Sequence, residues 1–206
     1  MRNVRLIASS LVTLLPAALA WTPASDPLAL APQSKLWIDG KSTVRKFSCK
    51  AAAFTVDVDG APGAIAGVLA AEKAVKTVVV HVPAEKLDCG NGTMNEHMMK
   101  AIKAKDAPTI EFKLTSYDVA KGATGVQGTL HGSLTLGGAT QTIAVPAQAS
   151  DAGTGLLHVT GAYELHMKEF GLKPPTLMMG TMKVDELVVV NFDLVLKSTA
   201  VATLEH

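Results

Sequence analysis

The feature that most constrains this chain is a period-two alternation of apolar and polar residues, which recurs over residues 35–198. The stretch TIEFKL, for example, places Ile110, Phe112 and Leu114 on one face of an extended chain. Alternation of this kind is typical of half-buried β-strands, and glycine-rich turns separate the stretches at hairpin spacing. The sequence therefore predicts an all-β domain of about eight or nine antiparallel strands. Such a meander must hide its edges, and a closed barrel and a sandwich both fit the pattern.

One segment, residues 93–105, breaks this period and predicts a helix between two strands. Thr93 and Glu96 fit the T-x-x-E pattern of a capping box at its start. Met94, Met98 and Ile102 recur every four residues and would form one apolar face. We expect this single amphipathic helix to cover the mouth or the side of the sheet.

The methionines and His97 of this segment raise the question of a copper site. Met94 and Met98 share one face of the predicted helix, but His97 lies on its flank. Core methionines and one surface histidine fit the amphipathic pattern without strain. We therefore expect no metal site.

The two ends of the chain differ in composition from its middle. Residues 1–20 combine two arginines, an apolar stretch too short to span a bilayer and a small-x-small ending, which predicts a signal peptide. Residues 21–34 are rich in Pro and Ala and predict a linker, residues 35–198 form the domain, and residues 199–206 are a tail. The mature protein is therefore expected to be periplasmic or secreted.

Export decides how the two cysteines are interpreted. Cys49 and Cys89 are the chain's only cysteines, and neither belongs to a C-x-x-C motif. In an oxidising compartment such a pair predicts a structural disulfide rather than free or metal-binding thiols. It would close a loop of about 40 residues, worth roughly 3–4 kcal/mol in loop entropy.

Composition and motifs exclude several classes of function. A net charge of +1 and 4% aromatic residues do not suggest a nucleic-acid partner. The chain has no G-x-S-x-G elbow and no phosphate-binding or dinucleotide fingerprint, so we expect no enzyme. Its content of 48% hydrophobic residues favours instead a function in which the protein binds an apolar molecule. Gly128 and Gly132 share the inward period of Leu130 and Leu134, which would leave volume unfilled if the sheet closes.

An ordered series of distinctive segments runs through the predicted domain. The most distinctive block is VVVHVPAEKLDCGNGTMNEHMMKAIKAKDAPTIEFKLTSYD. It is preceded by KLWIDGKSTVRKFSC and followed by VQGTLHGSLTLGGATQTIAVPA and then by LHMKEFGLK and VDELVVVNFDLVLK. In this order the segments resemble the YceI-like family of exported lipid-binding proteins. The resemblance implies a lipocalin-like, closed antiparallel β-barrel whose lumen holds a long isoprenoid chain, including polyprenyl quinones. In place of the family's common His-Ser pair, the first hairpin has GKSTVR, so no role for that histidine carries over.

The resemblance also shapes what we expect of the site and its partners. We expect no cofactor other than a bound isoprenoid or quinone lipid, and the family implies a cytochrome b-type membrane partner. The oligomeric state stays open, a dimer included. The alternative is a barrel with a filled core that binds no ligand and acts in the envelope as a stress or interaction protein. The predicted ligand-binding residues are five in the lumen, three on the helix and five at the mouth: Phe112, Leu114, Leu130, Leu134 and Phe192; Met94, Met98 and Ile102; Phe170, Leu172, Met178, Met179 and Met182.

Overall fold

The computed structural model describes residues 25–177 and 181–199. It confirms the predicted all-β domain and decides between the two architectures in favour of a closed antiparallel barrel. The predicted signal peptide, residues 1–20, lies outside the described residues, as do Met178, Met179 and the tail from residue 200.

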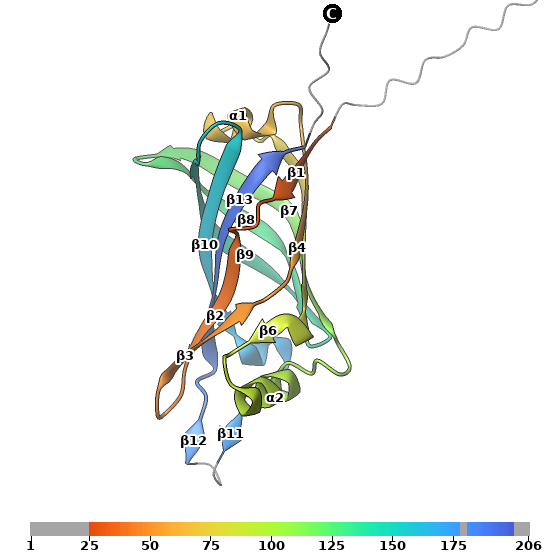
Figure 1. Ribbon diagram of the computed structural model, residues 1–206, viewed down its shortest axis with the longest axis vertical. Coiled ribbons are helices and arrows are strands. Elements are labelled where there is room, and N and C mark those ends of the chain that lie inside the picture. The colour runs from red at the N-terminus through yellow and green to blue at the C-terminus, as the bar shows by residue number, and fades with distance from the viewer. Residues whose placement is uncertain (1–24, 178–180, 200–206) are drawn as a thin grey trace, which may run out of the picture.

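Strands dominate the described chain, and most are joined by tight turns (Figure 1). The longest strands are at least eleven residues long, as the extended alternation in the sequence predicts. The elements in chain order are β1 (Asp26–Leu30), β2 (Lys35–Lys41), β3 (Lys46–Ala51), β4 (Thr55–Gly60), α1 (Ala64–Leu69), β5 (Val75–Pro83), η1 (Ala84–Lys86), β6 (Leu87–Asp88), α2 (Gly92–Ala101), β7 (Thr109–Gly122), β8 (Gly125–Leu136), β9 (Ala139–Asp151), β10 (Leu156–His166), η2 (Met167–Phe170), β11 (Thr176–Leu177), β12 (Met182–Lys183) and β13 (Leu187–Ser198).

The barrel closes because β1 pairs with two strands at once. β1 is antiparallel to β4 on one side and to β13 on the other. The closed circuit therefore runs β1-β4-β5-β7-β8-β9-β10-β13 and returns to β1. This differs from the predicted linker over residues 21–34, because Asp26–Leu30 within it forms the closing strand. Leu28 is buried there, whereas the segment's prolines and alanines hid its strand character from the sequence.

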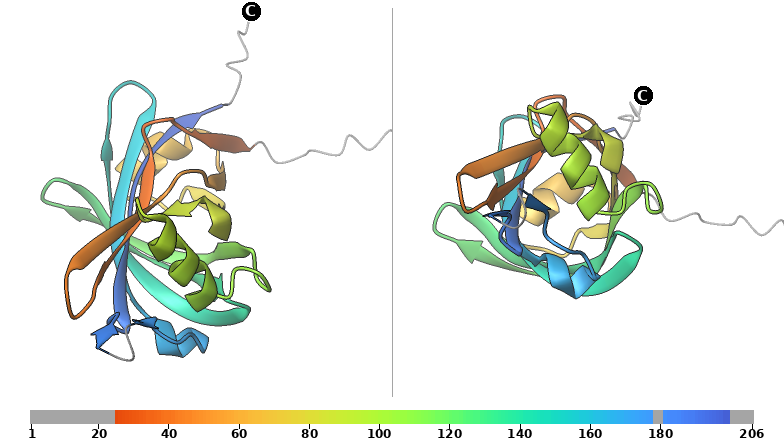
Figure 2. Two further views of the ribbon diagram at one scale, coloured as in Figure 1. Left: turned by 60° about the horizontal axis from the view of Figure 1, so that its bottom comes forward. Right: turned by 90° about the horizontal axis from the view of Figure 1, so that it is seen from below.

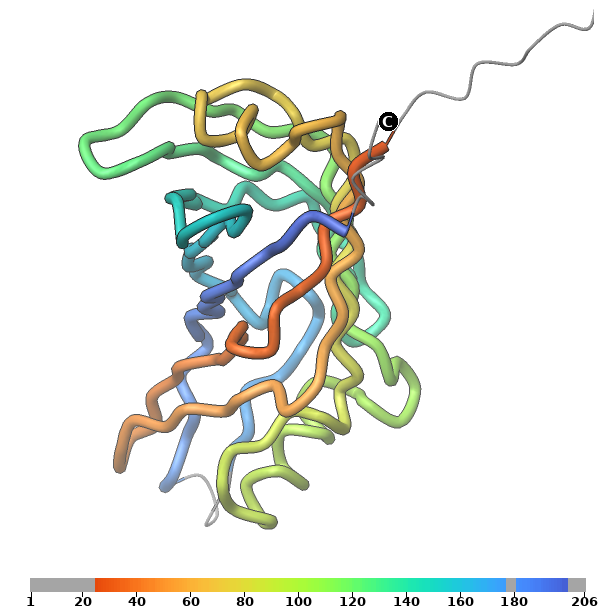
Figure 3. Tube along the Cα trace, turned by 45° about the horizontal axis from the view of Figure 1, so that its top comes forward, coloured from red at the N-terminus to blue at the C-terminus, as the bar shows by residue number. Residues whose placement is uncertain are grey.

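One end of the barrel carries additional elements beyond the circuit. β2 pairs with β13 below β1, and β3 and β6 extend that sheet. Figure 2 shows α2 lying across this end, next to the β2–β3 hairpin and the β11–β12 hairpin. We call it the α2 end. α1 caps the opposite end, which we call the α1 end (Figures 1 and 3).

The helices differ from the prediction in number and in capping. α1 was missed, because its sequence AIAGVL is short and lacks polar residues that would reveal a face. α2 was predicted, but the capping box was wrong. The N-cap is Asn91, whose side chain accepts a hydrogen bond from the backbone N–H of Met94 at 3.1 Å. Asn91 stands three residues before that amide, the position where a cap acts, so Thr93 already lies inside the helix.

A β-bulge in β7 changes which residues face the lumen. The register with β8 shifts between Leu114 and Ser116. Before the bulge, Phe112 and Leu114 face inward; after it, Tyr117 and Val119 do. An extra residue in one strand reverses the alternation that follows it. Tyr117 is consequently buried, and its hydroxyl accepts a hydrogen bond from the Val75 amide at 2.9 Å.

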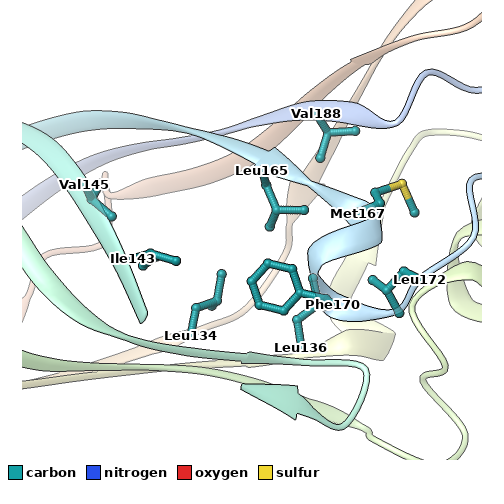
Figure 4. Close-up of a cluster of buried hydrophobic side chains, with 9 residues drawn as sticks. All are labelled: Leu134, Leu136, Ile143, Val145, Leu165, Met167, Phe170, Leu172 and Val188. Atoms are coloured by element: carbon teal, nitrogen blue, oxygen red, sulfur yellow. The ribbon is translucent and has the colours of Figure 1, made fainter. Parts of the chain in front are cut away.

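Two buried clusters occupy the two ends of the barrel. At the α1 end, Ala64 and Val68 of α1 pack onto buried residues of the surrounding strands, including Leu157. At the α2 end, the ring of Phe170 lies among Leu134, Leu136 and Leu165 (Figure 4). None of the helices in the described ranges has both the length and the apolar character needed to cross a membrane.

Candidate ligand-binding site

The barrel encloses an apolar cavity between the two clusters. Its volume is about 640 Å³, within the range of about 300–1,000 Å³ that is typical of small-molecule sites. Every strand of the closed circuit contributes to the wall, most often with Val or Leu. One lining residue from each of the eight is Leu28, Val56, Val78, Phe112, Leu130, Val145, Tyr163 and Val190. Inward-facing aliphatic side chains alternate with outward polar ones, so the strand period that the sequence shows produces this wall directly.

The structure places most of the predicted ligand-binding residues on this wall. Ten of them line the cavity: Met94, Met98, Ile102, Phe112, Leu114, Leu130, Leu134, Leu172, Met182 and Phe192. Phe170 does not line it. Its side chain is fully buried in the cluster at the α2 end, so it supports the wall instead of forming the mouth. Contact between any of these side chains and a ligand stays a prediction.

Sequence reasoning missed two kinds of lining residues. Further aliphatic residues of the circuit strands line the cavity, among them Val56, Val80, Val145 and Val159, and the alternation of those strands could have identified them. The polar residues Arg45, Thr93 and His97 also line it. Their position depends on how the β2–β3 hairpin and α2 meet at the α2 end, which no local pattern reports. His97, expected on the surface, is half-buried at the cavity.

Three phenylalanines lie flat against the wall because a glycine faces each of them. A Cβ atom added to Gly40 would stand 2.3 Å from the Phe47 ring, and one added to Gly161 would stand 2.3 Å from the Phe192 ring. A Cβ atom added to Gly132 would likewise stand 2.5 Å from the Phe112 ring. The expected empty volume beside Gly132 is thus occupied by an aromatic ring, a pairing that also supports strand register. Because the rings lie along the wall, the centre of the lumen stays open.

α2 covers the α2 end with the apolar face that the sequence predicted. Met94, Met98 and Ile102 line the cavity, yet none of the residues of α2 is fully buried. The methionines of this helix, expected in the core, are therefore only half-buried, and two of them, Met94 and Met98, line the cavity. The predicted disulfide between Cys49 and Cys89 is confirmed and ties β3 to the chain that enters α2. Met98 contacts the disulfide, with its Sδ 3.6 Å from the Cys89 Sγ.

The charged groups near the two ends of the barrel differ. At the α1 end, the carboxylate of Asp118 lies 3.3 Å from His131 Nε2 and 3.5 Å from Lys73 Nζ. The hydrogen bond from His131, followed by the one from Lys73, holds the pKa of Asp118 below its ordinary value. At the α2 end, the guanidinium of Arg45 contacts the Met94 Sδ at 4.0 Å. In the ranges that the structure describes, no three His, Cys, Asp or Glu side chains gather as a metal site would require.

Comparison with known proteins gives a family and a fold. The model of the YceI-like domain matches residues 37–196 of this chain. BcnA of Burkholderia cenocepacia has a similar structure, with a TM-score of 0.63 and 19% identity over 79% of this chain and 96% of that protein. A polyisoprenoid binding domain from Saccharophagus degradans, implicated in plant cell wall breakdown, has a TM-score of 0.59 and 10% identity, covering 83% of this chain and 98% of that domain.

A third similar structure is the YCEI protein of Campylobacter jejuni, with a TM-score of 0.57 and 16% identity over 74% of this chain and 85% of that protein. At these identities the likenesses show a common fold. A search of curated proteins finds no match.

Proposed function

The chain belongs to the YceI-like family, and on that premise we propose that it binds a long apolar ligand, an isoprenoid lipid or a polyprenyl quinone, in the barrel lumen and carries it. The observation that supports the proposal most directly is the apolar cavity of about 640 Å³. The similar domain from Saccharophagus degradans is described as polyisoprenoid binding, which agrees with an isoprenoid occupant.

Binding would be driven by removal of the apolar chain from water. Each methylene buried contributes roughly 0.8 kcal/mol, so a long chain needs few polar contacts. The half-buried face of α2 would cover the chain, and its methionines would adapt to different chain shapes. The alternative function requires a barrel whose core is filled with side chains, and a cavity of this size does not support it.

We further propose that the protein acts in the periplasm or outside the cell. The predicted signal peptide and the Cys49–Cys89 disulfide support this location, because structural disulfides persist in oxidising compartments. A cytochrome b-type membrane protein, implied by the family, is the proposed partner that loads or accepts the ligand.

The first experiment is to purify the protein from its own cell envelope, extract it with organic solvent and identify the extract by mass spectrometry. The proposal predicts a stoichiometric lipid with an isoprenoid chain. Added polyprenyl quinone should also be taken up by delipidated protein. If no lipid is extracted and none is taken up, the barrel is not a carrier.

A matched pair of variants tests whether the lumen is the site. Ala147 on β9 lines the cavity, whereas Ala144 on the same strand is exposed and faces outward. Ala147→Phe should fill the lumen and reduce lipid uptake at least tenfold, while Ala144→Phe should leave uptake unchanged. The melting temperature of each variant is measured in parallel, because a folded Ala147→Phe protein that still takes up lipid would place the ligand elsewhere.

A further inference from the structure

Few of the charged residues that the structure describes line the cavity, and those at one end have ion-pair partners whereas the one at the other end does not. In the described part of the chain, the charged lining residues other than histidine are Arg45 and Asp118. The Asp118 carboxylate is largely exposed on the outward face of β7, where it has Lys73 and His131 as partners. Within the described ranges, 25–177 and 181–199, the Arg45 guanidinium forms no ion pair. The cavity is therefore left with one uncompensated positive charge, at the α2 end.

The backbone that carries Arg45 is held in place. Ser42 Oγ accepts hydrogen bonds from the amides of Val44 and Arg45, at 3.3 and 3.1 Å, and donates to the Arg45 carbonyl at 3.0 Å. The Ser42 side chain is buried, so these bonds fix the β2–β3 turn at the rim. The guanidinium then reaches across to α2, where its Nη2 meets the Met94 Sδ. A thioether is a weak hydrogen-bond acceptor, so the N–H groups of the guanidinium can still donate to a stronger acceptor.

Other hydrogen-bonding groups stand beside this contact. His97 lies one helical turn after Met94, on the same side of α2, and Thr93 directly precedes Met94. Both His97 and Thr93 are lining residues of the cavity. Arg45 itself is exposed, so a head group at this position would sit at the boundary between the lumen and water. Apart from Tyr163, the lumen behind it is lined mainly by apolar side chains until the α1 end.

We propose that the protein selects amphiphiles with an anionic head group, a phosphate or a carboxylate, and holds that head at the α2 end against Arg45, with His97 and Thr93 as further hydrogen-bond partners. The tail then runs along the lumen towards α1. A guanidinium binds both kinds of anion through two parallel N–H···O bonds, which explains the shared chemistry. This inference rests on the proposed function, because it assigns the head group of the same ligand.

The test compares ligands that differ only in the head group. Delipidated protein is loaded with the neutral fluorescent probe phenylnaphthylamine, which is then displaced by geranylgeranyl phosphate or geranylgeraniol and, in a second arm, by hexadecanoate or hexadecanol. The two arms distinguish a phosphate from a carboxylate. The wild-type protein should prefer the anion to the matched alcohol by about tenfold in at least one arm. High salt should reduce this preference, because Arg45 is exposed.

Two variants locate the preference. Arg45→Gln should reduce it below about threefold and leave the affinity for the alcohol unchanged, because the tail contacts remain. Lys46→Gln removes the same charge from the next residue, which is exposed and does not line the cavity, and should keep the wild-type preference.

The outcomes separate this inference from the function on which it rests. If anion and alcohol bind equally, or if Arg45→Gln keeps the preference, the anionic head group is wrong while the lumen remains a lipid site. A neutral quinone as the stoichiometric lipid in the native extract would overturn it in the same way. If neither the anions nor the alcohols displace the probe or bind, the proposed function itself fails.

Discussion

Removal of the Cys49–Cys89 disulfide should cost the protein a large part of its stability. The two cysteines are 40 residues apart, and a loop of that length loses about 13 cal/mol/K of entropy in the unfolded chain, or about 4 kcal/mol at 25 °C. Cys49 is only 2% exposed, so Ala is the better replacement, because Ser would bury a hydroxyl. The Cys49→Ala/Cys89→Ala protein should unfold in urea at a midpoint roughly 1.3–2 M lower than the oxidised wild type, for an m-value of about 2–3 kcal/mol/M.

Urea unfolding followed by circular dichroism measures this shift, with the wild type in reductant as the control. Reduced wild type should match the double variant, because in the chain-entropy account both lose the same restraint on the unfolded state. The near-ultraviolet spectrum of the folded double variant should resemble that of the oxidised wild type. A midpoint that changes by less than about 0.3 M would refute the reasoning, since the loop would then contribute under 1 kcal/mol.

Three further predictions concern the wall, the helix and pH. Gly161→Ala should destabilise the barrel by about 1–3 kcal/mol in the same urea assay, because the added Cβ would stand 2.3 Å from the Phe192 ring and overpack the lumen. Asn91→Ala should speed amide hydrogen exchange in α2, at a cost of about 1 kcal/mol; Thr93→Ala should not, and equal effects would mean that the cap is misassigned. Burial raises the pKa of Tyr163 above its ordinary value of 10.0. Tyr163 should therefore ionise at a higher pH in the folded than in the unfolded protein. Its contribution to the free energy of unfolding is complete below pH 10 and declines as the pH rises further. An absorbance titration of tyrosinate that shows an ordinary pKa would contradict this.

The sequence was sufficient for the features that depend on short-range pattern. Period two along β7, β8 and β13 predicts their strands and their apolar faces, because successive side chains of an extended chain point to opposite sides. The break of that period predicts α2 and its apolar face with Met94, Met98 and Ile102. The disulfide also followed from the sequence, because only one intramolecular pairing of the cysteines exists.

Local errors arose where one short signal had two readings. The T-x-x-E pattern of Thr93 and Glu96 has the form of a capping box, but the preceding Asn91 caps the helix first. Phe170 is apolar and lies in an irregular segment, as a mouth residue would, yet the turn of η2 directs its ring into the buried cluster beside Leu165.

Tertiary structure alone decided the closure of the barrel and the character of its site. Closure depends on β1 pairing with β13 across the whole length of the chain, with Leu28 opposite Ser198, and such long-range pairing has no local signature. The open lumen depends on three phenylalanines each meeting a glycine on a neighbouring strand, as Phe192 meets Gly161. Arg45 reached the cavity for the same physical reason: its turn and α2 are distant in sequence, and only the folded barrel brings a cation to the edge of an apolar space.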